Sequence, residues 1–142
     1  MKKNILIIFL IASNVLFSQT TVTKKLGDFY KIKVYSGINV ELLKSNEHKI
    51  EVTGEKSENI KIKNSDGILK ISLKFPDLLA DGKVNVKLYY NEDIQVIDGN
   101  EGSIITGKDI NQTHIEVKAQ EGAFIDLEIK TKHLKVKSSS GG

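Results

Sequence analysis

Two acidic residues in the second half of the chain have the spacing of a glycosidase pair. Asp126 and Glu128 alternate with apolar residues, so both carboxylates face the same side of one predicted strand. Residues two apart on a strand lie about 6–7 Å apart, a separation that falls within the range of glycosidase carboxylate pairs. The same alternation is typical of any solvated strand face, and neither arginine nor an aromatic platform for sugar stacking accompanies the pair. We therefore predict that Asp126 and Glu128 are not catalytic.

The remaining residues with catalytic or metal-binding potential are also poorly spaced. No two of His48, His114 and His133 stand two or four residues apart, and the chain contains no cysteine. Each histidine neighbours a polar segment, which predicts exposed positions at strand edges or turns. The acidic turns at 92–93 and 98–101 lack the ligand spacing of known calcium loops, and no Gly-x-Ser-x-Gly motif occurs. The sequence therefore predicts no catalytic, metal or cofactor-binding residue, and a protein that is not an enzyme.

The first eighteen residues have the layout of a secretory signal. Lys2 and Lys3 precede an apolar run at 5–17, and cleavage is expected near Ser18. A retained membrane anchor is the alternative, but a spanning helix needs about 20 apolar residues. We expect a signal peptide at 1–18 and a single exported domain at 19–142. That domain would lie in the periplasm, on the outer-membrane surface or outside the cell, with no stable membrane span.

The charge pattern bears on the class of partner. The chain has 21 basic and 18 acidic residues, and every basic residue is lysine. Specific recognition of phosphates or base edges favours the planar guanidinium group of arginine, which this chain lacks. Lysine and glutamate alternate along the strands and form no block of one sign, which indicates a solvated face. We therefore predict no nucleic-acid partner.

Short alternating apolar runs follow one another about every ten residues from Asp28 onward. Turns containing glycine separate several of them, as at 36–37 and 66–67. An Asp-Gly pair supplies the positive φ that a tight reversal needs. No run has a convincing helical period, and tryptophan and cysteine are absent. The pattern predicts an all-β domain with a core of isoleucine, valine and leucine.

A weak internal repeat predicts how these strands are arranged. Residues 101–105 align with 121–125, and a second strand follows each copy. A repeat near twenty residues, with glycine at a fixed phase, predicts a β-solenoid. A β-sandwich is the alternative, because strands spaced by eight to twelve residues also fit it. Ser140-Gly141 would open another unit, so we expect a C-terminally truncated domain whose exposed end permits self-association.

The order of these segments resembles the putative auto-transporter adhesin, head GIN domain family of exported Bacteroidetes proteins. The matching stretch starts at Phe29, includes Gly37-Ile38-Asn39, and resumes at 65–71 and at the glycine turns from Gly102 onward. The resemblance implies a right-handed parallel β-helix with glycine-centred turns, a role in adhesion and no known catalytic residues. Two turns here read Glu-Gly where the family usually has Ser-Gly, and the family is usually longer.

Two functions are consistent with these observations. The first is a non-enzymatic cell-envelope or surface module for adhesion or interaction, whose ligand is an unidentified surface protein or glycan. The alternative is a polysaccharide-binding or polysaccharide-degrading β-helix protein. That alternative requires acidic side chains and an aromatic side chain to converge in one groove of the folded chain.

Overall fold

The structure is a computed structural model that describes residues 21–142, which form two six-stranded sheets. Sheet A has the strand order β1 (Val22–Lys25), β4 (Lys49–Thr53), β7 (Asn85–Tyr90), β3 (Asn39–Lys44), β9 (Ile104–Asn111) and β11 (Phe124–Lys130). Sheet B has the order β12 (His133–Ser139), β10 (His114–Gln120), β8 (Val96–Gly99), β2 (Lys31–Val34), β6 (Ile68–Leu73) and β5 (Ile60–Ser65). A short 3-10 helix, η1 (Ser57–Asn59), precedes β5. The predicted signal peptide at 1–18 lies outside the described residues.

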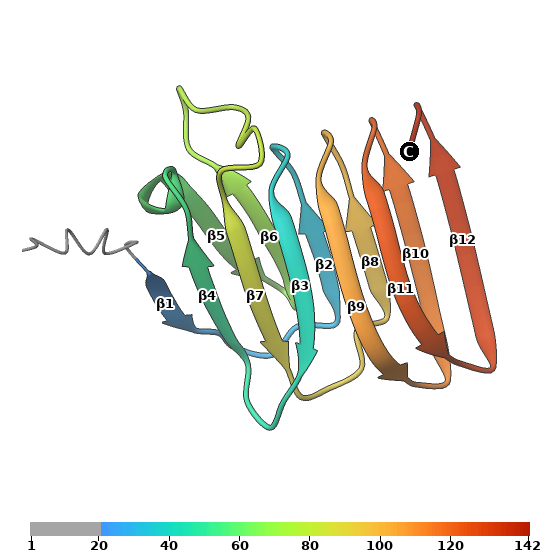
Figure 1. The fold of residues 1–142 in the computed structure, drawn as a ribbon. Coiled ribbons are helices and arrows are strands. Elements are labelled where there is room, and N and C mark those ends of the chain that lie inside the picture. The colour runs from blue at the N-terminus through green and yellow to red at the C-terminus, as the bar shows by residue number, and fades with distance from the viewer. Residues whose placement is uncertain (1–20) are drawn as a thin grey trace, which may run out of the picture.

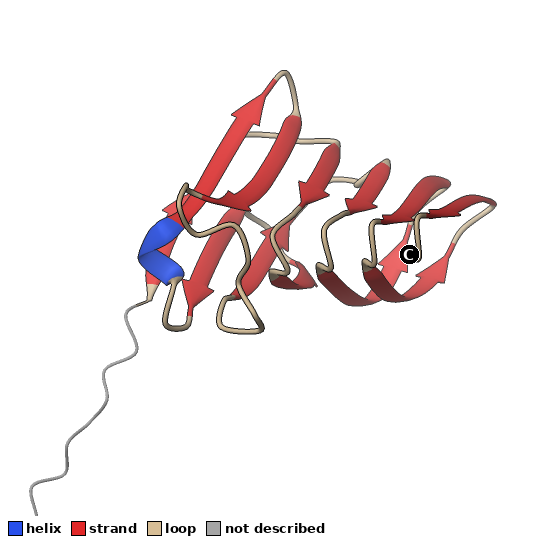
Figure 2. Ribbon diagram, turned by 90° about the horizontal axis from the view of Figure 1, so that it is seen from above, coloured by secondary structure: helices blue, strands red, loops and turns tan. Residues whose placement is uncertain are grey.

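The two sheets pack face to face around one hydrophobic core (Figures 1 and 2). Most strands place aliphatic side chains between the sheets and polar side chains outside, as β2 does with Ile32 and Val34 buried between outward lysines. Exceptions are Ile104, which lines the outer face of β9, and β12, which is exposed along its whole length. Burying one such side chain contributes about 1.5–3 kcal/mol. Tyr90 is the largest fully buried side chain, whereas neighbouring Tyr89 lies on the outer face. The predicted all-β class is confirmed, and the core is largely isoleucine, valine and leucine.

Five tight turns of one kind stack along an edge of the molecule, and we call this stack the turn ladder (upper edge of Figure 1). Both central residues have φ between 50° and 82° in the pairs Ser36–Gly37, Asp81–Gly82, Glu101–Gly102, Glu121–Gly122 and Ser140–Gly141. The residue after each pair donates its N–H back across the turn, as Ser103 does to the carbonyl of Asn100 at 3.1 Å. These are the features of type I′ turns.

Backbone hydrogen bonds also join successive turns of the ladder. The N–H of Gly37 donates to the carbonyl of Glu101 at 2.8 Å, and the N–H of Gly102 donates to the carbonyl of Glu121 at 2.9 Å. Gly122 donates in the same way to Ser140 at 3.2 Å. Residues about twenty apart therefore lie side by side in the sheets, with Ile104 opposite Phe124 in a parallel pair.

The predicted right-handed parallel β-helix, or β-solenoid, is wrong. Solenoid repeats stack in chain order, each on its neighbour, but here β7 lies between β3 and β4, and β2 lies between β6 and β8. The sheets are also mixed, because β1–β4, β4–β7 and β5–β6 pair antiparallel while seven other pairs are parallel. The turn at Asp66–Gly67 is the physical reason in one case, since it closes an antiparallel hairpin within sheet B.

Substitutions at two glycines can distinguish the free-energy cost of backbone strain from the cost of a steric clash. Gly102 has a φ of 68° with no atom within 4 Å of an added Cβ, whereas Gly54 has a φ of 113° and a Cβ there would lie 1.9 Å from the Lys83 carbonyl oxygen. We expect Gly102→Ala to lower the free energy of unfolding by about 1 kcal/mol through strain alone. Gly54→Ala should cost several times more, because backbone atoms must move. Denaturant unfolding measures both, and equal losses would contradict this account.

Candidate functional site

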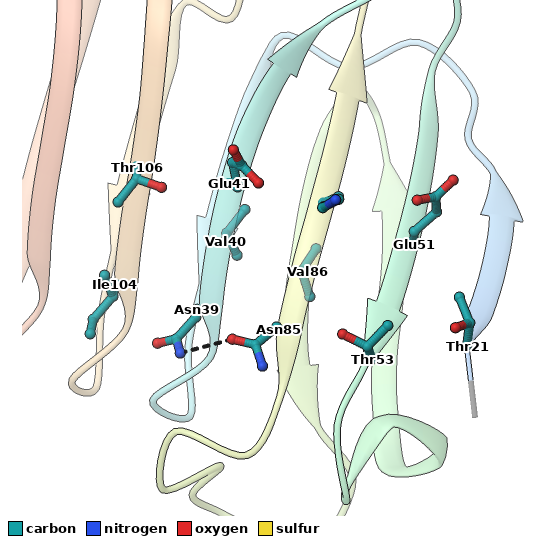
Figure 3. A pocket seen from close by; sticks show the side chains of 11 residues that line it. Thr21, Asn39, Val40, Glu41, Glu51, Thr53, Asn85, Val86, Ile104 and Thr106 are labelled. Atoms are coloured by element: carbon teal, nitrogen blue, oxygen red, sulfur yellow. Dashed lines mark hydrogen bonds between the residues drawn. The ribbon is translucent and has the colours of Figure 1, made fainter. Parts of the chain in front are cut away.

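The outer face of sheet A carries an open depression across strands β4, β7, β3 and β9 (Figure 3). Strand register places Thr53, Asn85, Asn39 and Ile104 side by side in one row. The side-chain amide of Asn39 donates to the side-chain carbonyl of Asn85 at 3.1 Å. The depression has a volume of about 550 Å³, and its lining combines polar side chains with the apolar Val40, Val86 and Ile104. It can supply hydrogen bonds to a ligand that lies flat on the sheet.

Charged side chains form the next row of the same face. Register places Lys87 between Glu51 and Glu41. Glu51 accepts a hydrogen bond from the Tyr89 hydroxyl at 3.1 Å and pairs with Lys49 at 3.0 Å. The Lys49 ammonium is the main cause that holds the pKa of Glu51 below its ordinary value, with Tyr89 and Lys87 acting in the same direction. Glu51 is thus an ionised acceptor, which does not suit it to proton donation at neutral pH.

The structure places Asp126 and Glu128 on the outer face of edge strand β11, where both are exposed. With Glu41 and Asp109 they line a second depression of about 700 Å³, and no aromatic side chain lines it. Sequence reasoning missed Glu41 and Asp109, because they reach Asp126 only through the pairing of β3, β9 and β11. The acids converge as the carbohydrate alternative requires, but the aromatic partner that it also requires is not among the lining residues.

The histidines follow the predictions only in part. His114 and His133 are exposed as predicted, and the pairing of β10 with β12 stacks their rings at 4.5 Å between centroids. His48 is buried, contrary to prediction, with its ring 4.8 Å from that of Phe29 and Nδ1 3.4 Å from the Asp28 carboxylate. Within residues 21–142, no group of three or more His, Cys, Asp or Glu side chains is placed to hold a metal ion.

The acidic turn at 98–101 supports the fold. Asp98 and Asn100 are buried, and Asp98 Oδ1 accepts hydrogen bonds from the side-chain amides of Asn100 at 3.0 Å and Gln120 at 2.9 Å. The Glu101 carboxylate accepts the backbone N–H of Ser36 at 3.1 Å. These carboxylates satisfy donors that would otherwise be unpaired in the turn ladder. Their geometry explains the acidic turn without a bound cation.

The structure is an all-β domain whose two sheets have broad outer faces with polar and charged side chains. The chain belongs to the putative auto-transporter adhesin, head GIN domain family, which matches residues 28–142. This description points to adhesion more than to catalysis, and to an exported or surface location. No helix among residues 21–142 is both long and apolar enough to cross a membrane.

Solved structures share the fold at low sequence identity. A putative adhesin from Bacteroides fragilis is 14% identical, with a TM-score of 0.71 over 86% of this chain and 59% of its own. A putative lipid binding protein from Parabacteroides distasonis is 14% identical, with a TM-score of 0.55 over 84% of this chain and 61% of its own. A putative adhesin from Parabacteroides merdae is 17% identical, with a TM-score of 0.51 over 82% and 57%. This chain thus spans about three fifths of their length, and no curated protein matches it in sequence.

The ion pair between Glu51 and Lys49 makes the stability of the folded protein depend on pH in the acidic range. Since the folded pKa of Glu51 is lowered, its contribution is present above the unfolded pKa and is lost as pH falls through the folded value. We expect Glu51→Gln to lower Tm at neutral pH, and this difference should shrink below about pH 4, near the ordinary pKa of glutamate. Glu41→Gln is the matched control, since Glu41 lines the same depression and has no ion pair within 4.0 Å among residues 21–142. Thermal melts from pH 3 to 8 measure both variants, and a pH-independent loss for Glu51→Gln would contradict the prediction.

Proposed function

We propose that this protein is a non-enzymatic, exported interaction module that contributes to adhesion at the cell envelope or surface. The observation that carries this function is the presentation of two broad outer faces by a rigid pair of sheets. On each face, the side chains of neighbouring strands lie close together, at positions set by strand register. Membership of the adhesin family supports the same proposal.

The shape of the candidate site also favours binding to a surface or polymer. Sites for small molecules are usually concave and bury most of the ligand. The depressions on sheet A instead lie on an open face between neighbouring strands. Their polar groups are already held in place, as the Asn39–Asn85 and Glu51–Tyr89 hydrogen bonds show. Such preorganisation lowers the entropic cost of binding an extended partner.

A second function, polysaccharide binding or cleavage, is favoured by one observation. Asp126, Glu128 and Glu41 line one depression, so a sugar chain crossing β11 would meet several carboxylates. Cleavage would need one of these groups to be protonated and to reach a glycosidic oxygen. Both carboxylates of the pair on β11 are exposed to solvent, and no aromatic side chain lines the depression beside them.

Binding and turnover can be measured on the same preparation. We expect the purified protein to bind saturably to a subset of surface glycans or extracellular-matrix proteins on an array, and to leave the length of any bound polysaccharide unchanged. Asp126→Asn/Glu128→Gln should not change the release of reducing ends, because we expect the native protein to release none. A heat-unfolded sample controls for non-specific adsorption.

Two results would contradict the proposed function. Absence of saturable binding to every array member would remove the support for an interaction module. Release of reducing ends by the native protein, abolished in Asp126→Asn/Glu128→Gln, would establish the second function.

A further inference from the structure

One row of outward-facing side chains crosses all six strands of sheet B and is almost entirely lysine. Strand register aligns, from β5 to β12, Lys63, Lys70, Lys33, Asp98, Lys118 and Lys137. We call this set the lysine row. Neighbouring strands are about 4.8 Å apart, so the row extends about 24 Å.

The rest of this face strengthens the positive charge. Lys31, Lys61 and Lys135 also point outward from strands of sheet B. Only two acids, Asp98 and Glu116, project from the same strand faces in the described residues. The outer face of sheet A differs, because its lysines are interleaved with glutamates and aspartates, as at Glu51–Lys87–Glu41. The excess of positive charge is therefore concentrated on one face of the molecule.

The acids on this face are already engaged. The Asp98 carboxylate is buried and accepts the amides of Asn100 and Gln120, while Lys33 is 3.9 Å away. Glu116 is shared among three lysines, Lys118 at 3.7 Å, Lys135 at 3.5 Å and Lys137 at 3.0 Å. These pairs leave Lys63 and Lys70, at the β5–β6 end of the row, without a carboxylate within 4.0 Å among residues 21–142.

At that end, like charges stand directly opposite one another. Lys63 pairs with Lys70, and Lys70 pairs with Lys33, across adjacent strands. Like charges at directly opposed positions destabilise a sheet. The Lys33–Asp98 pair and the Lys70–Tyr35 ring contact offset part of this cost, but among residues 21–142 no carboxylate pairs with Lys63 or Lys70. A ligand that supplies regularly spaced negative charge would relieve the repulsion.

We propose that the lysine row binds a linear anionic polysaccharide with carboxylate or sulfate groups repeated along its length. The inference rests on the proposed function and specifies its ligand class and binding face. Lysine is a flexible point charge and imposes little geometry on its partner. A row of such charges on a flat sheet therefore recognises charge density along an extended polymer.

Two other polyanions suit the row less well. Peripheral membrane binding combines basic residues with apolar side chains that enter the lipid. The exposed Phe75, Leu78 and Leu79 lie in the β6–β7 connection, outside the strands that carry the row. The exposed Leu134 and Val136 alternate with Lys135 and Lys137 along β12, so they project from the opposite side of that strand. Single-stranded nucleic acids bind through bases stacked on aromatic rings. Tyr35 lies beside the row with the Lys70 ammonium over its ring at 4.5 Å, and on the same face the rings of His114 and His133 stack on each other at 4.5 Å, so each of these rings already has a neighbour on one side.

The test measures binding of the full chain to immobilised polygalacturonate, dextran sulfate and neutral dextran. We expect binding to both anionic polymers, none to dextran, and at least a tenfold loss between about 50 and 500 mM NaCl, because salt screens exposed charges. The triple variant Lys33→Gln/Lys63→Gln/Lys70→Gln should weaken binding at least tenfold. Its Tm should stay close to that of the native protein, since removal of the opposed like charges offsets loss of the 3.9 Å Lys33–Asp98 pair.

A matched control removes three exposed lysines from sheet A. Lys24→Gln/Lys25→Gln/Lys130→Gln, on β1 and β11 and outside both depressions of sheet A, changes net charge by the same amount, and we expect its affinity to stay within twofold of the native protein. Equal weakening by both triple variants would overturn the proposal, because only net charge would then matter. Tighter binding to phosphatidylglycerol vesicles or to single-stranded DNA than to either glycan would also overturn it.

The array result separates this inference from the function on which it rests. Saturable binding to a neutral glycan or protein, with anionic polymers bound no better than dextran, would overturn the lysine row and leave the interaction module standing. Absence of binding to every probe would overturn both.

Discussion

The tight turn that carries β2, β8 and β10 of sheet B into β3, β9 and β11 of sheet A is the constraint on which this structure depends. Its two central residues both take positive φ, a conformation that costs a non-glycine residue about 1–2 kcal/mol. Glycine removes the cost at the second position, and hydrogen bonds between successive turns offset it at the first. The carboxylates of Glu101 and Asp98 add side-chain bonds within the same ladder. A turn that is hydrogen-bonded to its neighbours in this way fixes the register in which the following strand begins.

A fixed strand register aligns the outward residues of neighbouring strands into rows that extend across each sheet. A one-residue slip would move every outward side chain of a strand to the core. Since the turn ladder prevents that slip, Asn39 meets Asn85 on sheet A and Lys33 meets Lys70 on sheet B. Both rows are products of register, and neither exists within any single strand. Any partner that reads these faces depends on the turns, although it touches none of them.

Local features of the fold were predictable from the sequence because their causes are local. Alternation at 38–42 and 84–88 marked strands, and the Ser36–Gly37 and Asp66–Gly67 pairs marked reversals. Strand order was not predictable in the same way, because β7 is inserted between β3 and β4 through contacts between segments far apart in the chain. The site shows the same limit. Asp126 was identified as an outward acid, but its neighbour Glu41 lies 85 positions earlier and joins it only through β9.

The lysines illustrate how a correct local reading can conceal a property of the whole sheet. Lysine alternates with apolar residues along β2 and β5, which correctly indicated an outward face. It did not reveal that sheet pairing would collect these lysines on one side of the molecule. The sequence is nearly balanced in charge, with 21 basic and 18 acidic residues. The charge is nevertheless unevenly divided between the two outer faces, because sheet B carries the lysine row. Segregation of charge between faces gives one face a strong local potential, although the formal net charge of the chain is only +3. A stable aliphatic core and a hydrogen-bonded turn ladder allow the fold to tolerate the repulsion that such a face requires.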